Sequence, residues 1–71
     1  MESYIFTFGL GHIYEQKAIK IIASDWQSAR NCMVEHFDYD FSTQYFENDY
    51  LDFCRNMKLT PYPIIKEFIA K

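Results

Sequence analysis

Residues 3–8 read SYIFTF, and this stretch decides the fold. Its side chains alternate, so that Tyr4, Phe6 and Phe8 point to one side of an extended chain and the residues between them point to the other. Aromatic residues at a period of two are typical of a strand with one buried face. Residues 17–23, KAIKIIA, alternate in the same way. Together with the loop at Gly9 and Gly11, the two stretches predict an antiparallel hairpin.

A helix is predicted directly after the second strand. Ser24 and Gln27 stand three residues apart, as the N-cap and third residue of a capping box do. Apolar residues then recur at spacings of three and four and form one stripe of a helix that runs to about residue 37: Trp26, Ala29, Met33 and Phe37. Arg30 flanks this stripe, and we expect it to cover an aromatic ring or to pair with an acid from the third strand.

The second half of the chain is less regular. Residues 41–46 predict a third strand, and Asn48 or Asp49 would cap a short second helix that runs to about Met57. Tyr50, Cys54 and Met57 would form the apolar stripe of that helix. Residues 59–63 are expected to be extended, because proline excludes the helical conformation from the residue before it. The segment 64–71 is expected to be a terminal helical turn or a frayed tail.

These elements predict an α+β fold in the order ββαβ, followed by the short helix. The chain has 71 residues, which is the size of one domain spanning residues 1–71. We expect a small antiparallel sheet with one main helix packed on it. Aromatic residues make up 20% of the chain, so some are expected to remain at the surface, where a homodimer would bury them.

The sequence predicts a soluble protein of the cell interior. Its first residues carry no basic stretch followed by a long apolar one, and no apolar run approaches the roughly 20 residues that span a bilayer. Cys32 and Cys54 are its two cysteines, fewer than a secreted domain of this size usually has. Both thiols are expected to be reduced, and a disulfide between them is the alternative.

No metal, cofactor or enzymatic activity is predicted. Zinc sites are recognised by paired ligands such as C-x-x-C, whereas here Cys32 and His36 merely lie one helical turn apart. The glycines at positions 9 and 11 resemble a dinucleotide loop only in part, since Tyr14 stands where a third glycine is needed. A domain this small also has little room for the pocket that nucleophilic or acid–base catalysis requires.

The charge pattern is the main functional signal. Between Arg30 and Arg55 there is no lysine or arginine, while six acids occur there: Glu35, Asp38, Asp40, Glu47, Asp49 and Asp52. A negative field repels nucleic acid and attracts the basic groove of a protein. We therefore predict that these six acids bind a partner protein, with Tyr39, Tyr45 and Tyr50 as aromatic contacts. The alternative is an ordinary solvated surface, and the number of acids on one face decides between the two.

Residues 4–12, YIFTFGLGH, resemble the opening of a group of short orphan proteins from bacteriophages and prophages. The similarity extends over residues 4–46, through Ala23-Ser24-Asp25, the spaced helix residues Ala29-Arg30-x-x-Met33-x-x-x-Phe37 and Phe41-x-x-x-Tyr45, although members often have Trp where this chain has Phe41. The resemblance implies a phage accessory factor in the cytoplasm of a bacterial host, without a shared enzymatic activity. Such factors often block a host protein, including CRISPR and other defence nucleases. The group supplies no binding residues that could be carried over.

Two further functions remain open at this stage. One is a binder of a small nucleotide signal, whose pocket would be lined by the glycine bend Gly9–His12 and by Arg30, with Lys17 and Lys20 as the other basic residues near it. The other is a structural phage protein whose aromatic residues serve a homo-oligomeric contact.

Overall fold

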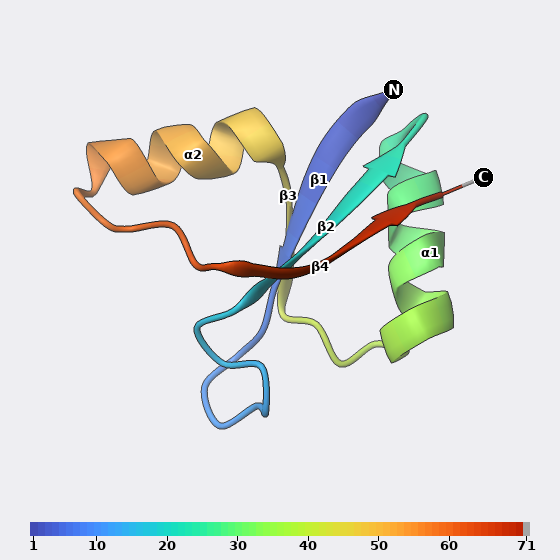
Figure 1. Ribbon diagram of the computed structural model, residues 1–71, viewed down its shortest axis with the longest axis horizontal. Helices are drawn as coiled ribbons and strands as arrows, with labels where there is room; N and C mark the ends of the chain where they lie inside the picture. Colours follow the sequence, from blue (N-terminus) through green and yellow to red (C-terminus); the bar gives the residue numbers. More distant parts are fainter. Residues whose placement is uncertain (71) are drawn as a thin grey trace.

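The computed structural model describes residues 1–70, and it is a four-stranded sheet with a helix on each face (Figure 1). The elements along the chain are β1 (Glu2–Thr7), β2 (Ala18–Ala23), α1 (Trp26–Phe37), β3 (Thr43–Phe46), α2 (Glu47–Asn56) and β4 (Ile64–Ile69). The predicted α+β class is confirmed. The observed order of elements is ββαβαβ, which has a final strand that the predicted order, ββαβ followed by a short helix, lacks. None of the helices within residues 1–70 has the length and apolar character needed to cross a bilayer.

The sheet is mixed and its strand order is β3-β1-β2-β4. β1 pairs with β2 and with β3 in antiparallel fashion, whereas β4 runs parallel to β2. The expectation of an entirely antiparallel sheet was therefore wrong. The expectation of a helical turn or a frayed tail at the end of the chain was also wrong, because residues 64–69 form a strand; Lys71 lies outside the described residues. Three isoleucines and a phenylalanine within six residues favour a strand once a neighbouring edge is available. The open edge of β2 supplies it.

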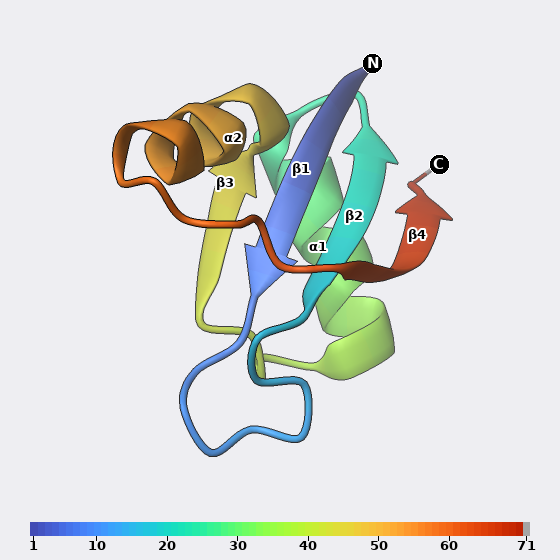
Figure 2. The same ribbon diagram turned by 60° about the vertical axis from the view of Figure 1, so that its left-hand side comes forward.

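Two crossover connections build the layers around this sheet. The first leads from β2 through α1 to β3, and the second leads from β3 through α2 to β4 on the other side of the sheet (Figure 2). Because the crossovers run in opposite directions over opposite faces, they have the same handedness. The segment 57–63 returns the chain from the end of α2 to the far edge of the sheet.

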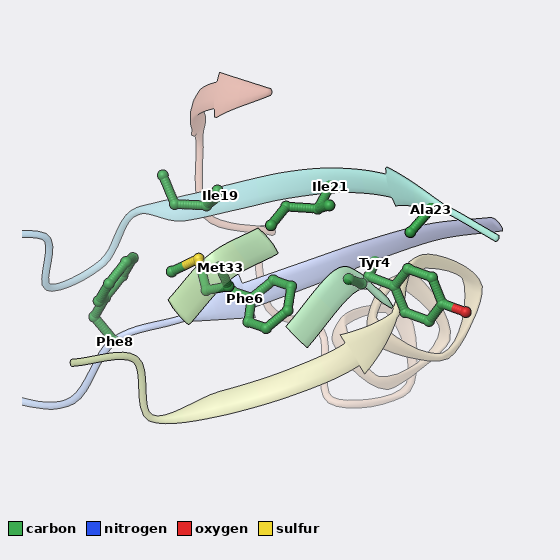
Figure 3. Close-up of a cluster of buried hydrophobic side chains, with 8 residues drawn as sticks. Tyr4, Phe6, Phe8, Ile19, Ile21, Ala23 and Met33 are labelled. Atoms are coloured by element: carbon green, nitrogen blue, oxygen red, sulfur yellow. The ribbon is translucent and has the colours of Figure 1, made fainter. Parts of the chain in front are cut away.

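The face covered by α1 holds the main core (Figure 3). The predicted alternation is confirmed, because all the inward residues of both strands and two of the helix stripe are buried there: Tyr4, Phe6, Phe8, Ile19, Ile21, Ala23, Ala29 and Met33. Phe6 is inaccessible to solvent and meets the ring of Phe41 edge-on at 5.0 Å between centroids. Arg30 covers the ring of Phe41, with its Cζ 5.0 Å from the ring centroid. This is the first of the two roles expected for Arg30, which was to cover an aromatic ring.

The opposite face, covered by α2, buries fewer residues. Ile5 and Ala18 of the sheet pack there against Tyr50 and Cys54 of the helix. Met57, expected in the same stripe, is 59% exposed, because α2 ends one residue before it and the chain turns away.

The predicted helix boundaries need two corrections. Asp25, and not Ser24, is the N-cap of α1: its Oδ1 accepts a hydrogen bond from the backbone N–H of Ser28 at 2.7 Å. α2 begins at Glu47, directly after β3, so neither Asn48 nor Asp49 caps it, and Phe46 at its N-cap supplies no side-chain bond. The last residue of β3 is thus also the N-cap residue of α2, and a phenylalanine there has no side-chain oxygen to accept an N–H bond.

Candidate protein-binding surface

The six acids fall into two groups on different sides of the sheet. Glu35, Asp38 and Asp40 belong to the end of α1 and the loop after it, whereas Glu47, Asp49 and Asp52 belong to α2. These helices cover opposite faces, so the six carboxylates do not form a single negative patch. The number of acids on one face, which the sequence left open, is therefore three and not six.

Three of the acids have a cationic neighbour. Glu47 pairs with Lys20 of β2 at 3.2 Å, and Asp52 pairs with Arg55 at 2.9 Å one turn along the helix. Asp40 lies 3.9 Å from the imidazole of His12, a contact that is ionic when the histidine is protonated. Within residues 1–70, Glu35, Asp38 and Asp49 form no ion pair, which leaves Asp49 as the unneutralised acid of α2.

The three tyrosines predicted as contact residues have different surroundings. Tyr39 is largely exposed beside the acids of the α1 side, and Tyr45 is half-buried on the α2 side. Tyr50 is only 6% exposed, and its hydroxyl accepts a hydrogen bond from the backbone N–H of Tyr62 at 2.9 Å. Burial raises the pKa of the Tyr50 hydroxyl, so this ring serves the packing of α2 and offers a partner little surface.

Large apolar side chains remain exposed along α2 and the segment that follows it. Phe53, Met57, Leu59 and Tyr62 are each between 40% and 59% exposed. Asp49 lies one helical turn before Phe53 on the same side of α2, and Met57 is the residue directly after the end of the helix. We call these five residues the α2 surface. An exposed apolar group with an acid at its border is typical of a contact region for another macromolecule.

A cavity of about 230 Å³ opens beneath the α2 surface. Its walls carry no charged side chain and are mainly aromatic, with Tyr45, Tyr50, Phe53 and Tyr62 among the lining residues. The rings of Tyr45 and Tyr50 lie 5.2 Å apart between centroids and are inclined by 46°. The residues that line this cavity come from the sheet, from α2 and from the segment after α2.

A second, more polar cavity of about 340 Å³ lies between α1 and the end of β4. Cys32, Glu35 and His36 line it, and the imidazole of His36 stacks on Phe68 at 4.1 Å between centroids. Burial and, to a smaller degree, the charge of Glu35 raise the pKa of the Cys32 thiol. A thiol held in its protonated form is a weak nucleophile, so the arrangement does not favour covalent catalysis.

The residues considered for metal or phosphate binding are not brought together. In the part of the chain from residue 1 to 70, no three histidine, cysteine or acidic side chains gather as metal ligands. Cys32 and Cys54 are both free and belong to opposite faces of the sheet. No lysine or arginine lines either cavity, because Arg30 covers Phe41 and Lys20 pairs with Glu47. The nucleotide pocket considered as an alternative, at Gly9, His12 and Arg30, coincides with neither cavity, and neither cavity has a cation to hold phosphate.

Comparison with protein-family models, with curated proteins and with solved structures found no match.

Sequence reasoning missed Phe53 and Tyr62. Phe53 stands three residues after Tyr50, beside the predicted stripe, so its spacing already placed it at the border of the buried face. Tyr62 lies between two prolines in a segment whose path over the sheet depends on the position of β4. No local pattern in the sequence reveals that path.

Proposed function

We propose that this protein is a binding module that attaches to another protein through the α2 surface. The observation that carries the proposal is the exposure of Phe53, Leu59 and Tyr62 around an open cavity on the thinly packed side of the sheet, with Met57 exposed at the end of α2. Aromatic residues and methionine are enriched in protein interfaces, and water-exposed apolar groups of this size gain from being covered.

The charge of α2 selects the kind of partner. Within α2 three acids and one arginine give a net charge of −2, of which Lys20 of β2 offsets one charge at Glu47; Lys58 follows the helix, and the whole chain has a net charge of −3. Such a surface disfavours phosphate backbones and favours a basic protein surface. A second copy of the chain would bring the same negative helix to the contact.

The finer form of the proposal rests on the resemblance of residues 4–46 to small phage proteins. In this form the protein acts in the cytoplasm of a bacterial host and blocks a basic, nucleic-acid-binding groove, such as that of a CRISPR-type defence nuclease. The acids of α2 accelerate the encounter with that groove, and the apolar residues slow dissociation.

The test compares three versions of the chain as bait in a bacterial lysate, followed by assays with the purified captured protein. The wild type is compared with Phe53→Ser/Met57→Ser and with a matched control, Leu10→Ser/Ile13→Ser. The control removes two apolar side chains that are 92% and 80% exposed in the β1–β2 loop. We expect the wild type and the control to bind one basic protein, and the α2 variant to bind it at least about tenfold more weakly.

The purified partner then decides the finer proposal. An inhibitor of a defence nuclease lowers DNA cleavage at equimolar concentration, and its association rate falls as salt rises. Equal binding by all three versions would overturn the role of the α2 surface. Sedimentation of the wild type as a dimer and of the α2 variant as a monomer would assign this surface to self-association instead.

A further inference from the structure

We infer that the cavity beneath the α2 surface receives an arginine side chain of the partner protein. This inference rests on the proposed function and names the chemical group that the surface recognises. It combines the aromatic lining of the cavity, the absence of charge on its walls and the position of one free carboxylate.

The rings provide faces on which a planar cation can stack. Tyr50 is buried and forms the inner wall, Tyr45 is inclined to it by 46°, and Phe53 and Tyr62 are the exposed outer walls. A guanidinium group binds to aromatic faces by cation–π attraction and by stacking, more often than a lysine ammonium does. The volume of about 230 Å³ suits one long side chain and not a folded segment.

The charges around the cavity admit a cation and disfavour an acidic group. No lysine, arginine or histidine lines its walls, so nothing there repels a positive charge. Asp49 has no ion pair within residues 1–70 and lies one turn before Phe53 on the same side of α2. Asp49 is not a lining residue, but its place on the turn of α2 next to Phe53 makes it the nearest candidate counterion, while the hydroxyls of Thr7 and Thr60 on the lining can accept N–H bonds.

The arginine is assigned to a different protein because of this charge complementarity. The chain has Arg30 and Arg55 as its own arginines, and both are engaged, one over Phe41 and the other with Asp52. A second copy would have to give up one of these contacts to fill the cavity; for the exposed pair of Arg55 with Asp52 that loss is small, and the net charge of −3 on each copy is what disfavours self-association. A basic partner brings a free guanidinium without that cost.

The experiment uses N-acetyl-arginine methylamide as the probe and N-acetyl-citrulline methylamide as its uncharged match. Each is titrated into the full chain, and the aromatic proton resonances are followed by NMR. We expect saturable shifts at Tyr45, Phe53 and Tyr62 with the arginine probe, and binding at least about fivefold weaker with citrulline. The indole resonances of Trp26, which packs on Tyr4 on the α1 face of the sheet, should stay unchanged.

Matched variants identify the carboxylate that takes part. Asp49→Asn should weaken arginine binding several-fold, whereas Asp38→Asn removes the same charge on the α1 side and should have no effect. Asparagine tolerates the positive φ of 55° at position 38, so the control keeps its backbone. Phe53→Ala, which truncates an exposed wall, should also weaken binding.

Three results would overturn the inference: equal binding of citrulline, shifts confined to other parts of the chain, or no shift up to the solubility limit of the probe. If partner capture through Phe53 and Met57 persists in any of these cases, the α2 surface stands and only the arginine assignment is wrong. The converse result is that the arginine probe binds the wild type while the Phe53→Ser/Met57→Ser variant still captures the partner. That result would overturn the surface proposal, and the cavity would then be an arginine site with no role in partner capture.

Discussion

The two faces of the sheet are built differently. The α1 face has eight buried residues in one cluster, whereas the α2 face has four. The first is a continuous core of aromatic and branched side chains, and the second is a contact between two small areas with exposed rings beside it. Stability is therefore concentrated under α1, and the surface suited to binding is concentrated at α2. A stable face can support a second face that is left free for a partner.

The largest effect that separates the faces is expected from Phe6→Ala. Phe6 is completely buried under α1, and deleting such a ring costs about 3–5 kcal/mol of unfolding free energy. That equals the whole net stability of a typical domain this small, so we expect a largely unfolded protein in urea titrations followed by circular dichroism. Phe53→Ala on the α2 side, 48% exposed, is the control and should stay within about 0.5 kcal/mol of the wild type. Equal losses would contradict the division of the core.

The next effect concerns local opening. With fewer buried contacts, α2 should detach from the sheet while α1 stays in place. We expect the amides of Cys54 and Arg55 to exchange with deuterium at least about tenfold faster than those of Arg30 and Met33, after correction for intrinsic rates. Iodoacetamide should modify the buried Cys54 through the same opening. Similar protection in both helices would mean that the layers unfold together.

A smaller effect is expected from the ion pair that holds the start of α2 to the sheet. The side chains of Lys20 and Glu47 are only 22% and 25% exposed, so Glu47→Gln should lower stability by about 0.5–1 kcal/mol, less so in high salt. Asp52→Asn breaks a pair whose side chains are 60% to 74% exposed, and it should change almost nothing. The urea midpoints of the two variants test this contrast, and a larger loss from Asp52→Asn would refute it.

The smallest effect lies at the start of α1 and appears only in acid. The N–H bond from Ser28 lowers the pKa of Asp25, so the contribution of this carboxylate is present above its unfolded pKa of about 3.9 and is lost as the pH falls through the lower folded pKa. Asp25→Asn keeps a good cap without a titrating group. Its urea midpoint should fall less steeply than that of the wild type below about pH 5. Parallel curves would show that Asp25 plays no part.

The first half of the fold could be predicted because its patterns are local. The alternation from Tyr4 to Phe8 and from Ile19 to Ala23 identifies the buried face of both strands, and the helical spacing of Ala29 and Met33 identifies the side of α1 that covers it. The N-cap was misplaced by one residue, since Ser24 and Asp25 are both good caps and only the backbone selects between them.

The second half could not be predicted in the same way. β4 reads IIKEFI, which has no clear period, and it becomes a strand because it pairs with β2, far away in the sequence. The candidate site depends on the same long-range topology. The acids and tyrosines could be named, but whether they share a face is decided by the side of the sheet on which α2 lies. Phe53 and Tyr62 meet around one cavity only because the segment after α2 crosses back toward β4.

The parallel pairing of β2 with β4 has a consequence for synthesis of the chain. Ala18 of β2 and its partner Ile64 of β4 are 46 positions apart, and a ribosome that adds about 5–20 residues per second needs roughly 2–9 seconds to make the stretch between them. During this interval the hairpin can form, but the outer backbone groups of β2 remain without their neighbour. Nascent chains on adjacent ribosomes can join at that unpaired edge until residues 64–69 dock on it, which makes early docking of β4 a protection against aggregation.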